Sequence, residues 1–101
     1  MTVTKVVKYT TKPEHADENE RLIRDVFAEL TAEHPEGLRY VSLRLGDGVT
    51  FIHVATIDGD SNPLSASAAF AKFQAGIGDR CDDGPHPSDA TVIGAYRLLP
   101  E

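Results

Sequence analysis

Hydrophobic and polar positions follow two different periods in the first third of the chain. Residues 3–11 form a short run rich in β-branched side chains, which predicts a strand. Pro13 ends this strand, because proline has no N–H to give to a sheet. Residues 14–34 predict a helix, since apolar side chains recur there at helical spacing: Leu22, Ile23, Val26, Phe27 and Leu30.

The remaining two thirds of the chain predict three more strands and one more helix. Residues 38–45 and 49–57 are strand-like runs, and the Asp47-Gly48 turn between them is typical of a β-hairpin. Residues 64–80 repeat apolar side chains at helical spacing and predict the second helix. After a polar connection, residues 90–99 predict the last strand.

This order of elements, strand–helix–strand–strand–helix–strand, is the ferredoxin-like arrangement. We therefore expect an α+β fold, in which a four-stranded antiparallel sheet carries two helices on one face. The chain has 101 residues, the length of one domain, and we assign residues 1–101 to a single domain. The second face of the sheet then has no helix to cover it.

The hairpin register divides the side chains of its two strands between the faces of the sheet. The more aliphatic set should lie beneath the helices: Leu45, Leu43, Val41, Arg39, Thr50, Ile52, Val54 and Thr56. The mixed set would then lie on the uncovered face: Leu38, Tyr40, Ser42, Arg44, Phe51, His53, Ala55 and Ile57. These include too much apolar surface to face water, so we expect two such faces to pack together in a homodimer.

Charge and composition exclude several classes of function. The chain has 16 acidic and 10 basic residues, and this net charge of −6 argues against binding to nucleic acid or to anionic lipid. No apolar run approaches the roughly 18 residues of a membrane span. The first residues lack the apolar stretch of a secretion signal, so we expect a cytoplasmic protein.

Nearly the whole chain resembles the dimeric α/β-barrel proteins, and within them the antibiotic-biosynthesis-monooxygenase-like group. The resemblance is carried by VVKYTTKP at residues 6–13, the acidic helix after it, GLRY at residues 37–40 and FIHVA at residues 51–55. It implies a ferredoxin-like chain that dimerises into an α/β barrel. It also implies a cofactor-independent monooxygenase that acts on small aromatic or polyketide-like molecules. The superfamily includes many other activities, and a shared fold does not establish a shared function.

His53 is the candidate catalytic residue, because it lies in mid-strand opposite Ser42 and imidazole titrates near neutral pH. It could be a general base or orient a ligand; alternatively, it is hydrogen-bonded within the fold and serves packing alone. Tyr40, Ser42 and Arg44 share its face, together with Phe51, and could bind a phenol or a carboxylate. The alternative for these polar residues is a network between subunits.

Phe70 and Phe73 of the second predicted helix are further candidates for substrate binding. They could line an apolar pocket above Val41, Leu43, Ile52 and Val54, or they could belong to an ordinary core. The resemblance favours the pocket, since monooxygenases of this fold hold flat aromatic substrates in that cleft. The alternative function for the chain is a non-catalytic dimer that binds a small molecule or serves as an accessory protein.

We expect neither a metal nor another cofactor. Haem-degrading members of the superfamily use an Asn, a Trp and an axial His. This chain has no Trp, its first strand carries Val6, Val7 and Lys8, and residues 64–80 contain no His. The histidines outside the hairpin are scattered and only one cysteine is present, so no spacing indicates a metal site.

Overall fold

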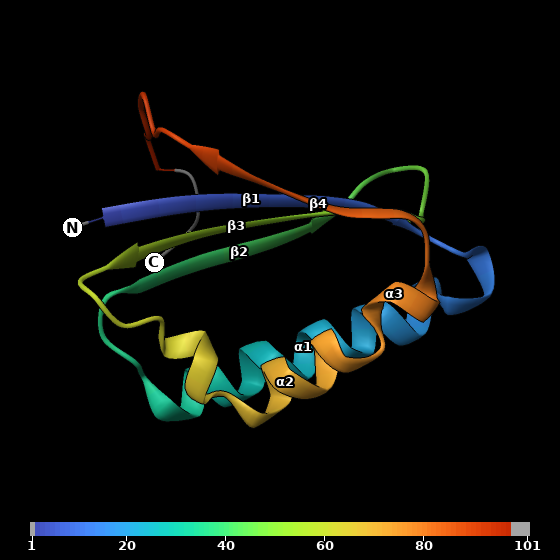
Figure 1. The fold of residues 1–101 in the computed structure, drawn as a ribbon, viewed down its shortest axis with the longest axis horizontal. Coiled ribbons are helices and arrows are strands. Elements are labelled where there is room, and N and C mark those ends of the chain that lie inside the picture. Colours follow the sequence, from blue (N-terminus) through green and yellow to red (C-terminus); the bar gives the residue numbers. More distant parts are fainter. Residues whose placement is uncertain (1, 98–101) are drawn as a thin grey trace.

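A computed structural model describes residues 2–97, in which one antiparallel sheet carries the helices on one of its faces (Figure 1). The four strands lie in the order β2-β3-β1-β4. The predicted ferredoxin-like α+β fold is therefore confirmed. The elements in chain order are β1 (Thr2–Thr11), η1 (Pro13–His15), α1 (Ala16–Glu33), β2 (Leu38–Arg44), β3 (Thr50–Asp58), η2 (Pro63–Ala66), α2 (Ala68–Ala75), α3 (Ile77–Arg80) and β4 (Cys81–Ala90).

The long helix α1 has the boundaries that its sequence pattern indicates to within two residues. Asp17 and Glu18 lie in its first turn, where negative charge is favourable to the helix dipole. It ends where His34 takes a left-handed conformation and its N–H donates to the carbonyl of Leu30 at 2.9 Å. None of the helices within residues 2–97 combines the length and apolar character needed to cross a membrane.

The second predicted helix, residues 64–80, is divided into the three short segments η2, α2 and α3. Ser67 causes the first break, because its backbone is extended and its side chain accepts from the N–H of Phe70 as an N-cap. Gly76 separates α2 from α3. The sequence therefore predicts the helical segment correctly but not its interruptions.

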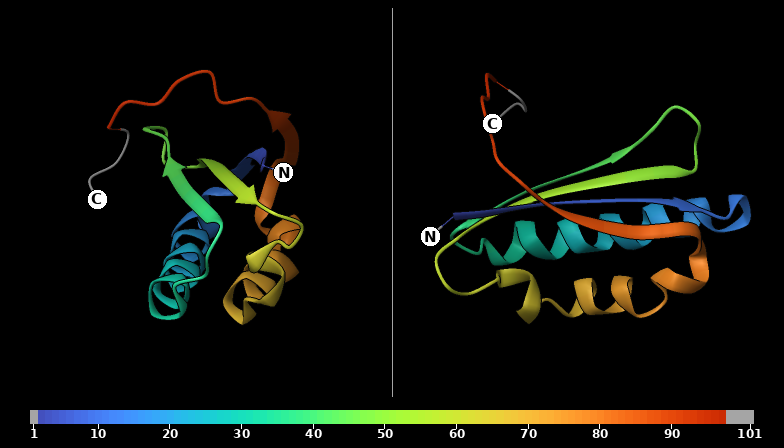
Figure 2. Two further views of the ribbon diagram at one scale, coloured as in Figure 1. Left: turned by 90° about the vertical axis from the view of Figure 1, so that its left-hand side faces the viewer. Right: turned by 45° about the horizontal axis from the view of Figure 1, so that its top comes forward.

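The last strand was predicted in the wrong place. It spans Cys81–Ala90, where the sequence pattern indicated a polar connection, and residues 91–97 form no strand. β4 lies at the edge of the sheet and pairs with β1 alone, so Pro85 and Pro87 are tolerated there. After β4, the chain continues on the side of the sheet opposite the helices (Figure 2). Residues 98 and 99 of the predicted strand lie outside the described residues.

The predicted hairpin register is confirmed, but the assignment of its two faces was wrong. Ser42 pairs with His53 and Arg44 with Phe51, as expected. Yet His53 is 5% exposed and Phe51 is 1% exposed, because both lie beneath the helices. The large rings of this face reach the helices, whereas the opposite, mostly aliphatic set forms the face that the helices leave uncovered. Leu43 belongs to that open face and is 46% exposed.

The hydrophobic core fills the space between the helices and the ring-bearing face of the sheet. Phe27 of α1 stacks on Tyr40 with ring centroids 4.9 Å apart. Tyr9 of β1 stacks on Phe51 with centroids 5.5 Å apart. The buried members of the hydrophobic core are Tyr9, Ala16, Leu22, Ile23, Val26, Phe51, Leu64, Phe73 and Cys81. Leu38, Tyr40, Phe51, Ala55 and Ile57 therefore cannot form the dimer interface that the sequence indicated, since they face the helices of their own chain.

The corrected face assignment predicts different costs for two alanine substitutions. Phe51→Ala should lower the free energy of unfolding by about 3–5 kcal/mol, because it empties a fully packed site. Leu45→Ala should cost clearly less than Phe51→Ala, since Leu45 is 37% exposed and not beneath the helices of its own chain. Urea denaturation followed by circular dichroism, at one protein concentration, measures both. Similar losses for the two variants would contradict the assignment.

Candidate functional site

A pocket of about 560 Å³ lies between α2 and the ring-bearing face of the sheet. We name it the inner pocket. Most of its wall is apolar or aromatic, and its polar groups come from β1, β2 and β3, from α2 and from the loop before η2. The lining residues are Lys5, Val7, Tyr9, Tyr40, His53, Ala55, Ile57, Asn62, Leu64, Phe70, Phe73, Gln74, Ile77, Pro85 and Pro87. A concave apolar site with a few polar groups is the usual form of a small-molecule site.

His53 of β3 is the polar centre of this pocket, and both of its ring nitrogens are hydrogen-bonded. Its Nε2 lies 2.7 Å from the hydroxyl of Tyr9 on β1. Its Nδ1 lies 2.6 Å from the hydroxyl of Tyr40 and 2.8 Å from Oγ of Ser42, both on β2. Phe73 of α2 closes over the ring, with centroids 5.4 Å apart. The three neighbouring strands thus hold the imidazole in one orientation.

The hydrogen bonds continue from Tyr9 into the helices. Asn19 of α1 donates from Nδ2 to the Tyr9 hydroxyl at 2.9 Å. Arg80 of α3 donates from Nε to Oδ1 of Asn19 at 3.0 Å, and from Nη2 to the carbonyl of Phe73 at 2.6 Å. Asn19 is fully buried and Arg80 is 5% exposed. Within residues 2–97, no carboxylate forms an ion pair with this buried guanidinium.

Burial determines the protonation of the three rings around the pocket. It lowers the pKa of His53 to about 4, because a charged imidazolium would lose its hydration there. Burial also raises the pKa of the Tyr9 and Tyr40 hydroxyls above their ordinary value. At neutral pH the imidazole is therefore uncharged and both phenols keep their protons.

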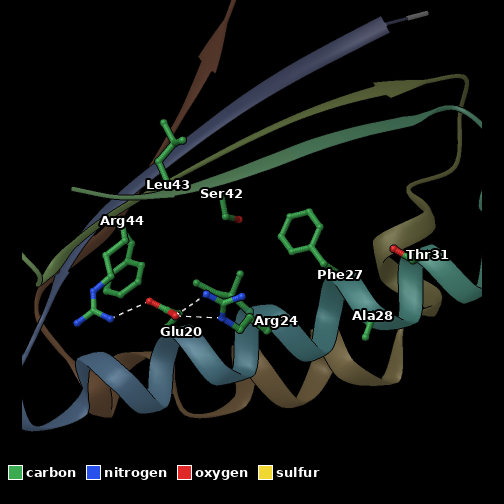
Figure 3. A pocket seen from close by; sticks show the side chains of 10 residues that line it. Glu20, Arg24, Phe27, Ala28, Thr31, Ser42, Leu43 and Arg44 are labelled. Carbon is green, nitrogen blue, oxygen red and sulfur yellow. Dashed lines mark hydrogen bonds and ion pairs between the residues drawn. The ribbon is translucent and has the colours of Figure 1, made fainter. Parts of the chain in front are cut away.

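A second cavity, the outer groove, lies between α1 and β2 and has a volume of about 780 Å³ (Figure 3). Arg44 bridges its mouth, donating to Glu20 at 2.8 Å and to Asp17 at 3.2 Å. These bonds to Arg44 hold the pKa of Glu20 below its ordinary value. In Figure 3, Ser42 points from β2 toward α1, whereas Leu43 points to the other side of the sheet.

The structure brings together most of the residues that the sequence selected. His53, Tyr40 and Ser42 form one hydrogen-bonded cluster, and Phe70 and Phe73 line the inner pocket beside it. The prediction that aliphatic residues of the sheet lie beneath the two phenylalanines was wrong. These residues lie on the open face: Val41, Leu43, Ile52 and Val54. Two other candidates, Arg44 and Phe51, line the outer groove instead.

Sequence reasoning missed Tyr9, Asn19 and Arg80. Asn19 gives a usable signal, since it interrupts the apolar stripe of α1 between Ala16 and Leu22, where a buried polar side chain needs a partner. Tyr9 lies in the first predicted strand, where an aromatic residue is common and gives no sign of a functional role. Arg80 lies near the end of a helical segment, where a basic residue is expected for the helix dipole alone.

Comparison with known proteins identifies the fold. No protein-family model and no curated protein sequence matches the chain. A "putative antibiotic biosynthesis monooxygenase" from Bacteroides thetaiotaomicron superposes with a TM-score of 0.77 at 14% identity, over 91% of this chain and 90% of that one. A protein of the same name from Caulobacter crescentus gives 0.71 at 17% identity, over 92% and 91%. PA3566 from Pseudomonas aeruginosa gives 0.72 at 20% identity, over 92% and 95%. At these identities, the resemblance that the sequence suggested is confirmed for the fold.

The lowered pKa of His53 makes a prediction about stability and pH. The pKa is about 4 in the folded chain, against 6.5 for an ordinary histidine. As the pH falls from 7 to 5, the unfolded chain therefore binds a proton at His53 that the folded chain does not bind. This group should cost about 2 kcal/mol of stability over that range. His53→Gln should lose this part of the pH dependence, measured as unfolding free energies at both pH values. Equal pH dependence in the two proteins would contradict the buried, neutral state.

Proposed function

We propose that the chain is a small cytoplasmic enzyme, similar to cofactor-independent monooxygenases, that acts on a small aromatic or polyketide-like molecule in the inner pocket. The observation that carries this proposal is the inner pocket itself. Its volume of about 560 Å³ suits one small multi-ring molecule. Had side chains filled this space, the chain would have offered no room for a substrate. The names of the Bacteroides and Caulobacter proteins, which share the fold, agree with this class of reaction.

In the proposed function, the protein binds and orients the substrate and assists the removal of its hydroxyl proton. An electron-rich phenol can supply electrons to molecular oxygen, and it does so more readily after losing its hydroxyl proton. With 1-naphthol, one oxygen atom of O₂ would enter the 1,4-naphthoquinone and the other would leave as water. Phe70 and Phe73 provide flat apolar surfaces for such a ring. His53, Tyr40 and Tyr9 are already ordered by their hydrogen bonds, so little reorganisation is needed when the substrate enters.

The alternative proposal is a non-catalytic protein that binds the same class of molecule. It is favoured by the environment of His53, because both ring nitrogens already have partners. Burial also lowers the pKa of the ring to about 4, which weakens it as a base. Binding and turnover must therefore be measured separately.

Binding in the inner pocket is tested with 1-naphthol as a fluorescent probe. Ala55→Leu should weaken its binding by roughly five- to 150-fold, because Ala55 lines the inner pocket and overpacking such a site costs about 1–3 kcal/mol. The matched control is Ala28→Leu, which adds the same group to the outer groove. An equal effect of both variants, or an effect of the control alone, would contradict the inner pocket as the binding site.

Oxygen uptake with 1-naphthol, together with formation of 1,4-naphthoquinone, then separates the enzyme from the binding protein. The wild-type chain should accelerate uptake above the spontaneous rate, and Ala55→Leu should remove the acceleration. His53→Gln should lower kcat by about a hundredfold or more if His53 takes part in proton transfer. Binding of 1-naphthol without accelerated uptake of oxygen would favour the non-catalytic alternative.

We also propose that the chain is a homodimer, now through the open face of the sheet. This face carries five aliphatic side chains: Val6, Val41, Leu43, Ile52 and Val54. The chain after β4 leaves on the same side (Figure 2) and adds further exposed apolar side chains, Val92, Ile93 and Tyr96. Apolar area of this kind is stabilised by about 25 cal/mol per Å² when a second copy covers it.

Multi-angle light scattering tests the dimer. The wild-type protein should have twice the mass of one chain at micromolar concentration. Val54→Asp should give a folded monomer, because it places a charge at the centre of the open face without touching the core. Ala32→Asp adds the same charge to the exposed side of α1 and should remain a dimer. A wild-type monomer, or a Val54→Asp dimer, would contradict this interface.

A further inference from the structure

We infer that Arg80 and Asn19 are positioning residues, which keep the proton of the neutral His53 ring on Nδ1. As a consequence, the Tyr40 hydroxyl offers its hydrogen to the inner pocket. The ligand that fits presents an oxygen that accepts this hydrogen, such as a carbonyl, quinone or phenolate oxygen. The statement about the ligand rests on the proposed binding function, whereas the statement about the proton does not.

The direction of the hydrogen bonds is fixed at their far end by Arg80. A guanidinium group can only donate, so the Asn19 atom that meets Arg80 Nε at 3.0 Å must be the carbonyl oxygen Oδ1. The Asn19 amide therefore has one orientation, in which its NH₂ group faces Tyr9 at 2.9 Å. The second bond of Arg80, to the Phe73 carbonyl, anchors the guanidinium in place.

The orientation of Asn19 in turn determines what Tyr9 does with its proton. The Tyr9 hydroxyl oxygen accepts from Asn19 and has one other partner among residues 2–97, Nε2 of His53 at 2.7 Å. Tyr9 has no surface exposed to water, so its hydrogen has no solvent acceptor. It must therefore donate to Nε2, and Nε2 carries no hydrogen. The ring is neutral, as its lowered pKa also requires, so its proton is on Nδ1.

Counting hydrogens around Nδ1 shows why this tautomer matters for a ligand. Nδ1, the Tyr40 hydroxyl and the Ser42 hydroxyl form one cluster, with distances of 2.6 and 2.8 Å from Nδ1. With the proton on Nδ1, the cluster has three hydrogens and two oxygens that accept. Nδ1 donates to these oxygens, and neither hydroxyl can donate to Nδ1. The hydroxyl hydrogens are therefore left to point out of the cluster.

The other tautomer would use the Tyr40 hydrogen within the protein. An unprotonated Nδ1 can accept it, because the Tyr40 hydroxyl lies 2.6 Å away. Of the two hydroxyls, Tyr40 lines the inner pocket and Ser42 lines the outer groove. An acceptor atom of a ligand in the inner pocket can therefore accept the Tyr40 hydrogen, which the protonated Nδ1 cannot accept. Arg80 and Asn19 set this preference without lining the pocket themselves.

The substitution Asn19→Asp reverses the direction of the hydrogen bonds from residue 19 through Tyr9 to His53, and it hardly changes the shape of the side chain. A carboxylate only accepts, so it takes the Tyr9 hydrogen as well as that of Arg80. The Tyr9 oxygen must then accept from Nε2, and the His53 proton moves from Nδ1 to Nε2. The introduced carboxylate forms an ion pair with Arg80 that compensates the added charge, so the variant should fold. Two-bond ¹H–¹⁵N correlation spectra at pH 7 distinguish these tautomers, and His53→Gln identifies the signals of His53.

The second measurement compares acetophenone with ethylbenzene, which has similar shape but no acceptor oxygen. NMR titrations should show that the wild-type protein prefers acetophenone. Asn19→Asp should reduce the preference by roughly two- to tenfold, the worth of one hydrogen bond. The control Ala32→Glu adds the same charge to the exposed side of α1 and should change neither the tautomer nor the preference.

The possible outcomes separate this inference from the proposed function. An Nδ1–H tautomer in the wild-type protein that becomes Nε2–H in Asn19→Asp supports the positioning role. An Nε2–H tautomer in the wild-type protein overturns it, whatever the probes do. The expected tautomers with binding of neither probe would contradict the proposed binding function and leave the positioning role supported. Binding of both probes without preference would overturn the inferred donor at Tyr40.

Discussion

The arrangement of this protein depends on a buried chain of hydrogen bonds that begins at a guanidinium group, which has no carboxylate partner among residues 2–97. Taking Arg80 out of water is costly unless every donor finds an acceptor. Oδ1 of Asn19 accepts from Nε of Arg80, and the carbonyl of Phe73 accepts from Nη2. Asn19 then needs Tyr9, and Tyr9 needs His53. Because each link comes from a different helix or strand, satisfying one buried group fixes the relative positions of the helices and the sheet.

This network explains why the helices cover the face of the sheet with the more polar composition. Imidazole, phenol and hydroxyl groups on β1, β2 and β3 can be buried only where they are hydrogen-bonded to each other and to the helices. The rings also span the distance between the two layers better than valine or isoleucine does. The same requirement leaves space beside His53, since flat rings and short α2 turns do not fill the volume completely.

The sequence was sufficient for the fold and for the hairpin register, because both depend on periodicity and turn chemistry. Asp47-Gly48 fixes which residues are paired, and α1 is a long amphipathic segment. Counting apolar residues could not predict which face of the sheet the helices cover. His53 and Val54 lie on opposite faces, and what distinguishes the two faces is the set of residues from other elements that contact them. β4 was missed for a related reason: an edge strand with Pro85 and Pro87 pairs through one side only. Of the site, His53, Tyr40 and Ser42 were predicted, whereas Tyr9 and Arg80 carry no local signal.

The two faces of the sheet thus have different physical tasks. On the helix-covered face, the polar groups from Arg80 to His53 are ordered by one another, so the direction of each of these hydrogen bonds follows from the group that can only donate. The open face has aliphatic side chains without directional preference, which suits contact with a second copy of the chain. Side chains alternate along β3, so that His53 faces the inner pocket and Val54 lies on the open face, where we propose that a second copy binds. The two faces share no side chain, so the proposed ligand binding and the proposed dimerisation can vary separately.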